Sequence, residues 1–199
     1  MKNMQKVLAL VLCGALCVVM ISCATGGGSG EFGPGVLAVG EWNVYNDRTS
    51  DGGSSISYLN IIEEVIDGQT KSVKHVTGEV TEQFRYGFAG WGLDADEATT
   101  ELYKTARALS FTILGDGKRY SLKFKISSVT DYCYHEYAFQ TEEGVVETFE
   151  IPMRFLMQPS WGNPARLNQS LVTGVEWQTH ESWRPGTFDI KMWDFKIHQ

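Results

Sequence analysis

The stretch Tyr120-Ser-Leu-Lys-Phe-Lys-Ile126 decides the fold, because apolar and polar side chains alternate along it with a period of two. Alternate residues of a strand point to opposite faces, so one apolar set faces a core while Lys123 and Lys125 face water. The run from Arg107 to Leu114 is a second strand candidate. Gly115-Asp116-Gly117-Lys118 lies between the two, and its Gly and Asp tolerate the positive φ of hairpin turns. The sequence predicts a hairpin here.

Working outward, seven further segments have strand character: 37–45, 55–66, 71–85, 132–140, 145–151, 174–179 and 187–198. We expect the second and third of these to be interrupted. In the last segment the apolar positions change parity between Met192 and Trp193, which predicts a β-bulge. The only helical candidate is 94–106, with Asp94 or Asp96 as its N-cap. This pattern predicts an all-β fold, an antiparallel β-sandwich or jelly roll with at most one short helix.

The N-terminal segment 1–22 has the features of a secretory signal. Lys2 and Lys6 precede an apolar run from Val7 to Ile21, which is shorter than the ~20 apolar residues of a membrane-spanning helix. The run ends in Val19-Met-Ile-Ser22-Cys23, which resembles the lipobox of bacterial lipoproteins. The resemblance implies cleavage before Cys23 and a lipid anchor on it, with fatty acyl chains such as palmitate. The alternative is an ordinary signal peptide that is cut elsewhere.

Composition limits the functions open to the rest of the chain. Residues 23–35 are rich in Gly and Ser and predict a flexible tether, so residues 36–199 form one domain. The formal charge is −7 for the whole chain, and the signal carries two lysines and no acid, so the remainder carries −9. An acidic domain does not attract nucleic acid or anionic lipid. Cys133 is the one cysteine left after Cys23, which excludes an intrachain disulfide and predicts a small buried side chain.

Several segments, taken in order, resemble the CIA30 family. They are Trp42-Asn-Val-Tyr-Asn-Asp47 followed by Gly52-Gly-Ser-Ser-Ile-Ser57, then Gly115-Asp-Gly-Lys-Arg-Tyr120, then Phe149, Ile151 and Pro152, and finally Phe188 and Ile190. The resemblance spans roughly residues 40–198 and extends to family 11 carbohydrate-binding modules. It implies a galactose-binding-like jelly roll, and it informs the fold better than the function.

Sugar sites use aromatic rings against the C–H faces of pyranoses and carboxylates toward the hydroxyls. Trp91, Trp161 and Trp183 stand in Gly-, Pro- and Ser-rich surroundings that predict exposed rings on loops. Tyr134 and Glu136 share one parity of a strand, so both would face the same side of a sheet. These five residues are the predicted ligand-binding residues. The alternative for each ring is packing without a ligand.

Asp47 and Asp51 are the candidate metal ligands, since hard carboxylate oxygens suit a structural calcium ion. The four histidines are far apart and form no zinc pattern. No nucleophile elbow or phosphate loop occurs, and Glu63-Glu64 and Glu142-Glu143 would each point to opposite faces of a strand. We therefore expect no enzyme activity.

Two functions remain open at this stage. One is a lipid-anchored, exported protein that binds a glycan non-catalytically. The other is an envelope lipoprotein that binds protein or serves a structural role. The first predicts a groove lined by aromatic and polar groups, and the second predicts an apolar patch. Ala24 stands where some lipoproteins carry an acidic inner-membrane signal, which favours the outer membrane.

Overall fold

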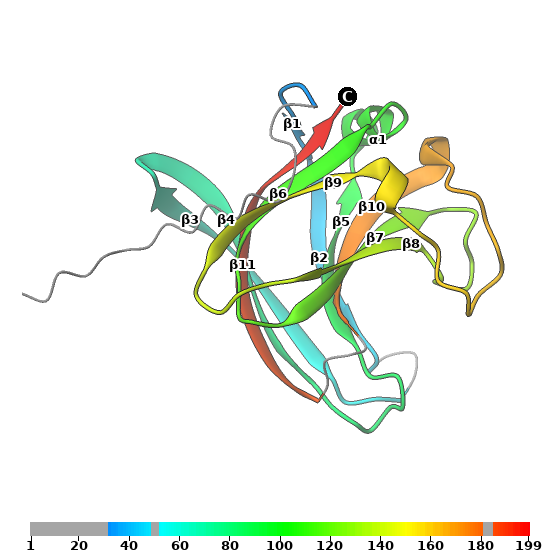
Figure 1. Cartoon of the computed structure of the whole chain (residues 1–199). Helices are drawn as coiled ribbons and strands as arrows, with labels where there is room; N and C mark the ends of the chain where they lie inside the picture. Colours follow the sequence, from blue (N-terminus) through cyan, green and yellow to red (C-terminus); the bar gives the residue numbers. More distant parts are fainter. Residues whose placement is uncertain (1–31, 49–51, 181–184) are drawn as a thin grey trace, which may run out of the picture.

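The described chain consists of two antiparallel sheets and one short helix (Figure 1). The computed structural model describes residues 32–48, 52–180 and 185–199. Sheet A has the strand order β3-β4-β11-β6-β9, with β1 added to β11, and sheet B has the order β2-β5-β10-β7-β8. The strands of sheet A are β1 Val36–Leu37, β3 Ile56–Ile66, β4 Gln69–Val80, β6 Ala108–Leu114, β9 Val146–Pro152 and β11 Gly186–His198. Those of sheet B are β2 Gly40–Asn46, β5 Ala89–Ala95, β7 Arg119–Ile126, β8 His135–Gln140 and β10 Val172–Thr179.

The core lies between the two sheets and is rich in aromatic rings. Trp177 of β10 stacks on Trp91 of β5 with ring centroids 6.1 Å apart and planes 6° apart, and on Trp42 of β2 at 5.7 Å. Phe111 of sheet A meets Trp177 edge-on at 5.6 Å, which joins the sheets. Large rings of this kind each bury much apolar area and contribute strongly to the stability of a core. The all-β prediction is therefore confirmed.

The alternation at 120–126 is confirmed, but the predicted hairpin is wrong. Tyr120, Leu122, Phe124 and Ile126 are all buried. β6, however, pairs with β9 and β11, while β7 pairs with β8 and β10. Gly115–Lys118 thus crosses from one sheet to the other. Turn chemistry permits the reversal of direction, but it does not fix which strands pair.

Three segments differ from the sequence-based expectation. β3 and β4 run without interruption and pair from Ile56 opposite Glu79 to Ile66 opposite Gln69. Their hairpin extends beyond the part of β4 that pairs with β11 (Figure 1). β4 ends at Val80, and the segment 89–95, expected to be an exposed loop, is instead the buried strand β5.

The helix and the bulge follow the sequence signals. Helix α1 spans Glu97–Tyr103, and the Asp96 side chain accepts a hydrogen bond from the Thr99 amide as its N-cap. In β11 the pairing with β6 shifts between Trp193 and Lys196, where Asp194 has a φ of 51°. The predicted bulge is confirmed. No helix of the described residues is long and apolar enough to span a membrane.

Several predictions fall on residues that the structure does not describe. The signal 1–22, Cys23 and most of the tether lie outside the described residues, as do Asp51 and Trp183. Cys133 is buried, as expected, and its thiol contacts the Pro159 carbonyl oxygen at 3.3 Å.

Candidate functional site

The outer face of sheet B, opposite the core, is the candidate site. We call it the polar face. Lys123 of β7 pairs with Glu176 of β10 on one side and with Glu136 of β8 on the other. Residues paired in this way project from the same side of a sheet. The polar face comprises Asn43, Tyr45, Asp94, Ser121, Lys123, Lys125, Glu136, Glu176 and Gln178.

Glycines in the middle strands make room for the larger side chains of this face. A Cβ atom at Gly90 would lie 2.5 Å from the Tyr45 ring, and one at Gly92 would lie 3.2 Å from the Glu176 side chain. Tyr45 and Glu176 therefore lie against the bare backbone of β5. Glycine in a strand interior weakens the strand and often marks such a close approach.

Lysines, carboxylates and an amide form a connected network across the polar face. Lys123 donates to Gln178 at 3.0 Å and lies 3.9 Å from Glu136. Lys125 donates to Asp94 at 2.9 Å and lies 3.7 Å from Glu176. Each lysine thus links neighbouring strands, and the face presents hydrogen-bond donors and acceptors side by side.

Burial shifts the pKa of several of these groups. Desolvation raises the pKa of the Glu176 carboxyl, although Lys125 and Lys123 oppose the shift. Desolvation, followed by the charges of Glu176 and Glu136, also raises the pKa of Tyr45. The Tyr45 hydroxyl is therefore a neutral donor at physiological pH, and Glu176 titrates closer to neutrality than an ordinary glutamate.

Of the two residues predicted to share a strand, only Glu136 belongs to β8 and to this network. Glu136 is on the polar face, whereas Tyr134 precedes β8 and is only 7% exposed. Burial is the largest cause of the raised pKa of Tyr134, and the charges of Glu176 and Lys125 also act on it. Tyr134 thus packs with the buried residues of the core, and the charges of Glu176 and Lys125 lie near enough to act on its pKa. Because Tyr134 lies outside β8 and packs with the core, the placement of both side chains on one face of sheet B stays a prediction.

A loop extends sheet B beyond β8 and carries exposed rings. The Met157 amide and carbonyl exchange hydrogen bonds with Glu136 at 3.0 and 2.9 Å, and Gln158 donates to the Cys133 carbonyl at 2.8 Å. The Asp131 carboxylate accepts from the Asn163 amide at 2.7 Å. These bonds hold the loop against 131–136, and they leave the ring of Trp161 64% exposed at this edge. The exposure predicted for Trp161 is confirmed.

The exposure predicted for Trp91 is wrong. Trp91 is 0% exposed, stacks on Trp177 and meets Tyr120 edge-on at 5.7 Å. Its glycine neighbours clear the opposite, outer side of β5 rather than placing the ring on a loop. Trp91 therefore presents no ring face to a ligand in this fold.

Asp47 is a buried carboxylate with protein donors around it. It accepts hydrogen bonds from the amide and the hydroxyl of Ser55 at 2.9 and 2.7 Å and from the Phe88 amide at 3.2 Å. These contacts brace the turn after β2 and give Asp47 a structural role. No group of three or more His, Cys, Asp or Glu suited to a metal ion occurs in the described part of the chain. Calcium at Asp47 and Asp51 stays a prediction.

Sequence reasoning missed most of the polar face. Tyr45, Lys123, Glu176 and Gln178 occupy alternate strand positions, where polar residues ordinarily mark a solvent-facing side and nothing more. The one signal in the sequence was Gly90-Trp-Gly92, in which glycines alternate with an apolar residue. Glycines spaced in this way clear one side of a strand.

Comparisons with solved structures give the same architecture. The chain is similar to the family 11 carbohydrate-binding module of the cellulosomal cellulase Lic26A-Cel5E of Clostridium thermocellum, with a TM-score of 0.53 and 16% identity over 82% of this chain and 88% of that one. It is also similar to the family 11 module from the same organism in complex with a β-1,3-1,4-mixed-linked tetrasaccharide, with a TM-score of 0.53 and 15% identity over 83% of this chain and 93% of that one. These likenesses show the fold, a jelly-roll β-sandwich.

No curated protein matches the sequence significantly. The family described as "Complex I intermediate-associated protein 30 (CIA30)" matches residues 34–192, most of the chain. This match agrees with the motifs at 42–57 and 115–120 and with the sandwich that they build. The chain belongs to the CIA30 family.

Proposed function

We propose that this protein binds a glycan non-catalytically on the polar face of sheet B, and that lipid on Cys23 holds it on a membrane surface. The observation that carries the proposal is the network of Lys123, Lys125, Glu176 and Gln178, set over the glycines of β5. Similarity to carbohydrate-binding modules supports it at the level of the fold.

The network matches the hydrogen-bonding needs of a sugar. Each hydroxyl of a pyranose is both a donor and an acceptor. Carboxylates such as Glu176 and Glu136 accept, whereas Lys123 and the protonated Tyr45 hydroxyl donate. Hydrogen bonds that involve an ionised partner are the stronger ones. Trp161, at the edge beyond β8, offers an apolar ring to the C–H face of a further sugar unit.

The same composition argues against protein docking on this face. A protein-binding patch is poor in charge at its centre and rich in exposed apolar area. The centre of the polar face instead carries two lysines and several carboxylates. A glycan is therefore the better match, because its recognition requires polar groups that converge on one surface.

A glycan array probed with the full chain tests the proposal. Glu176→Gln removes the central carboxylate charge, and Glu150→Gln makes the same change at an exposed site on β9 of sheet A. We expect Glu176→Gln to weaken binding by roughly tenfold or more and Glu150→Gln to leave it unchanged. No binding to any glycan, or equal binding by both variants, would contradict the proposal.

The anchor is tested separately. Cys23→Ala should move the protein from the membrane fraction to the soluble fraction, because the attachment site for lipid is lost. A variant that still partitions into detergent would contradict the lipid anchor. This outcome would leave the glycan proposal untouched, since the polar face contains no residue of the tether.

A further inference from the structure

The outer face of sheet A carries a cleft that shares no residue with the polar face of sheet B. It has a volume of about 420 Å³ and lies over β3, β4 and β11 beside the loop that follows β6. Its lining includes Tyr58, Thr77, Glu79, Lys118, Thr187 and Asp189. The cleft is shallow and open to solvent, and its volume lies within the range of small-molecule sites, roughly 300–1,000 Å³.

Strand register brings the lining together. Tyr58, Thr77 and Asp189 pair across three neighbouring strands, so their side chains form one row on the outer face. Glu79 and Thr187 form the adjacent row. The Tyr58 ring is 58% exposed, so an aromatic surface stands next to carboxylates and hydroxyls.

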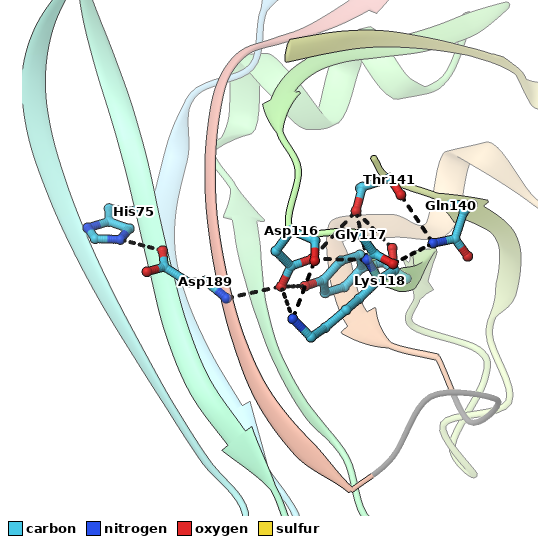
Figure 2. A network of polar contacts seen from close by, with 8 residues as sticks. His75, Asp116, Gly117, Lys118, Gln140, Thr141 and Asp189 are labelled. Carbon is cyan, nitrogen blue, oxygen red and sulfur yellow. Dashed lines mark hydrogen bonds and ion pairs between the residues drawn. The ribbon is translucent and has the colours of Figure 1, made fainter. Parts of the chain in front are cut away.

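A mostly enclosed carboxylate, with 9% of its side chain exposed, fixes the opposite wall of the cleft (Figure 2). Asp116 accepts from the Lys118 ammonium at 3.1 Å, from the Tyr120 hydroxyl at 2.9 Å and from the Asp189 amide at 3.1 Å. One residue thus ties the loop between the sheets to β11. Lys118 and the Asp189 backbone are held in place before any ligand arrives, which lowers the entropic cost of binding.

Two further contacts complete the network in Figure 2. Thr141 donates its hydroxyl to the Lys118 carbonyl at 2.9 Å, and Gln140 donates to the Gly117 carbonyl at 2.9 Å. On the other side, Asp189 pairs with His75 at 2.8 Å, while most of its side chain is exposed. Asp189 is therefore oriented and still accessible from solvent.

The chemistry of the lining selects a class of ligand. Glu79 and Asp189 disfavour an anion, and Lys118 disfavours a multiply charged cation. An exposed ring beside oxygen acceptors and an ammonium donor suits a neutral, polyhydroxylated ring. We propose that this cleft is a second site, separate from the polar face, for a neutral oligosaccharide. The proposal rests on sheet A alone and does not depend on binding at sheet B.

Nuclear magnetic resonance of the ¹⁵N-labelled full chain locates binding residue by residue. The probes, each at millimolar concentration, are the β-1,3-1,4-mixed-linked tetrasaccharide, neutral manno-, galacto- and xylo-oligosaccharides, and spermidine as a cationic comparison. We expect at least one saccharide to shift the amides of Thr77, Gly78 and Lys118. Tyr58→Ala should weaken this response by about tenfold or more, as expected for a lost stacking ring.

Matched variants separate this site from the polar face. Tyr86→Ala removes a ring of nearly equal exposure, 57% against 58% for Tyr58, from the segment before β5, and it should leave the cleft response unchanged. Glu176→Gln should also leave it unchanged. Asp189→Asn keeps the backbone bond to Asp116 and should weaken the response.

Three results would overturn the proposal. The first is that no saccharide shifts the cleft amides. The second is an equal response in Tyr58→Ala and the unaltered chain. The third is a response to spermidine alone. Loss of the cleft response in Glu176→Gln would show instead that the two faces are not separate sites.

Discussion

Trp91 and Trp161 have similar sequence surroundings and opposite environments. Trp91 lies between Gly90 and Gly92 and is 0% exposed, whereas Trp161 precedes Gly162 and is 64% exposed. Trp91 belongs to β5 and points into the core. Trp161 lies on a loop held by hydrogen bonds between 157–163 and 131–136.

The difference lies in the spacing of the glycines. Gly90 and Gly92 alternate with Trp91, so all glycine positions fall on one side of a strand and the ring falls on the other. Only one glycine, Gly162, adjoins Trp161, so glycines do not alternate with the ring there. A glycine-rich context thus indicates an exposed ring only when the glycines break the alternation, and a cleared strand face when they follow it.

Removal of the buried Trp91 ring is expected to change the free energy of unfolding more than any other variant in this comparison. Trp91→Ala should cost about 3–5 kcal/mol of unfolding free energy, because it leaves a cavity beside Trp177 and Tyr120. Denaturant unfolding measures the loss. Trp91→Phe should cost less, since it keeps most of the packing and removes an indole N–H that has no partner within the described structure. A loss below about 1 kcal/mol for Trp91→Ala would contradict burial.

The next effect tests the cleared face of β5. Gly90→Ala should destabilise the fold by about 1–3 kcal/mol, because the new Cβ would lie 2.5 Å from both the Tyr45 ring and the Trp177 carbonyl oxygen. Gly33→Ala is the control, since nothing lies within 4 Å of its added Cβ. If the two variants had the same melting temperature, glycine at position 90 would not be needed to make room for the Tyr45 ring.

A smaller effect concerns the pH dependence of stability. Burial raises the pKa of Glu176 in the folded protein, so folding favours the protonated carboxyl. Its contribution is fully present below the unfolded-state pKa and is lost as pH rises through the folded-state pKa. We expect the unfolding free energy of Glu176→Gln to decline less steeply than that of the unaltered chain as pH rises above the unfolded-state pKa of glutamate. Unfolding at several pH values measures it, and an unchanged profile would contradict the shift.

The smallest expected effect on stability is at the exposed ring. Trp161→Ala should change the unfolding free energy by no more than about 0.5 kcal/mol, because the ring lies mostly in solvent. It should nevertheless weaken glycan binding if the ring stacks on a sugar. Melting and array measurements on one preparation separate the two effects. A large loss of stability would show that Trp161 is packed like Trp91, and the two rings would no longer differ in environment.

The sequence predicted strands better than their partners. The alternation from Tyr120 to Ile126 identified β7 and its buried side, and the parity change near Met192 identified the bulge of β11. The pairing of β6 with β9 and β11 could not be read from Gly115–Lys118. A reversal of direction has the same local chemistry within a sheet or between two sheets.

The site was predicted less well, for a related reason. Tyr134 and Glu136 were predicted to share a face because parity along one strand is local information, but only Glu136 belongs to β8. The polar face as a whole depends on register between β5, β10 and β7, which are far apart in the chain. Asp116 is a similar case, since its bond to the Asp189 amide joins residues 73 positions apart.

The short strand β1 determines how a mechanical load would enter this fold. Val36 and Leu37 pair with β11 beside the C-terminus (Figure 1), and the Ala38 amide adds one bond to the Phe195 carbonyl, whereas β2 is held to β5 along its whole length from Gly40. A pull on the N-terminal end therefore peels β1 first and is then resisted at β2. Release of residues 36–39 frees roughly 13–14 Å of chain at about 3.3–3.6 Å per residue. Under tension the chain can therefore lengthen by releasing β1 while the strands from β2 onward stay paired.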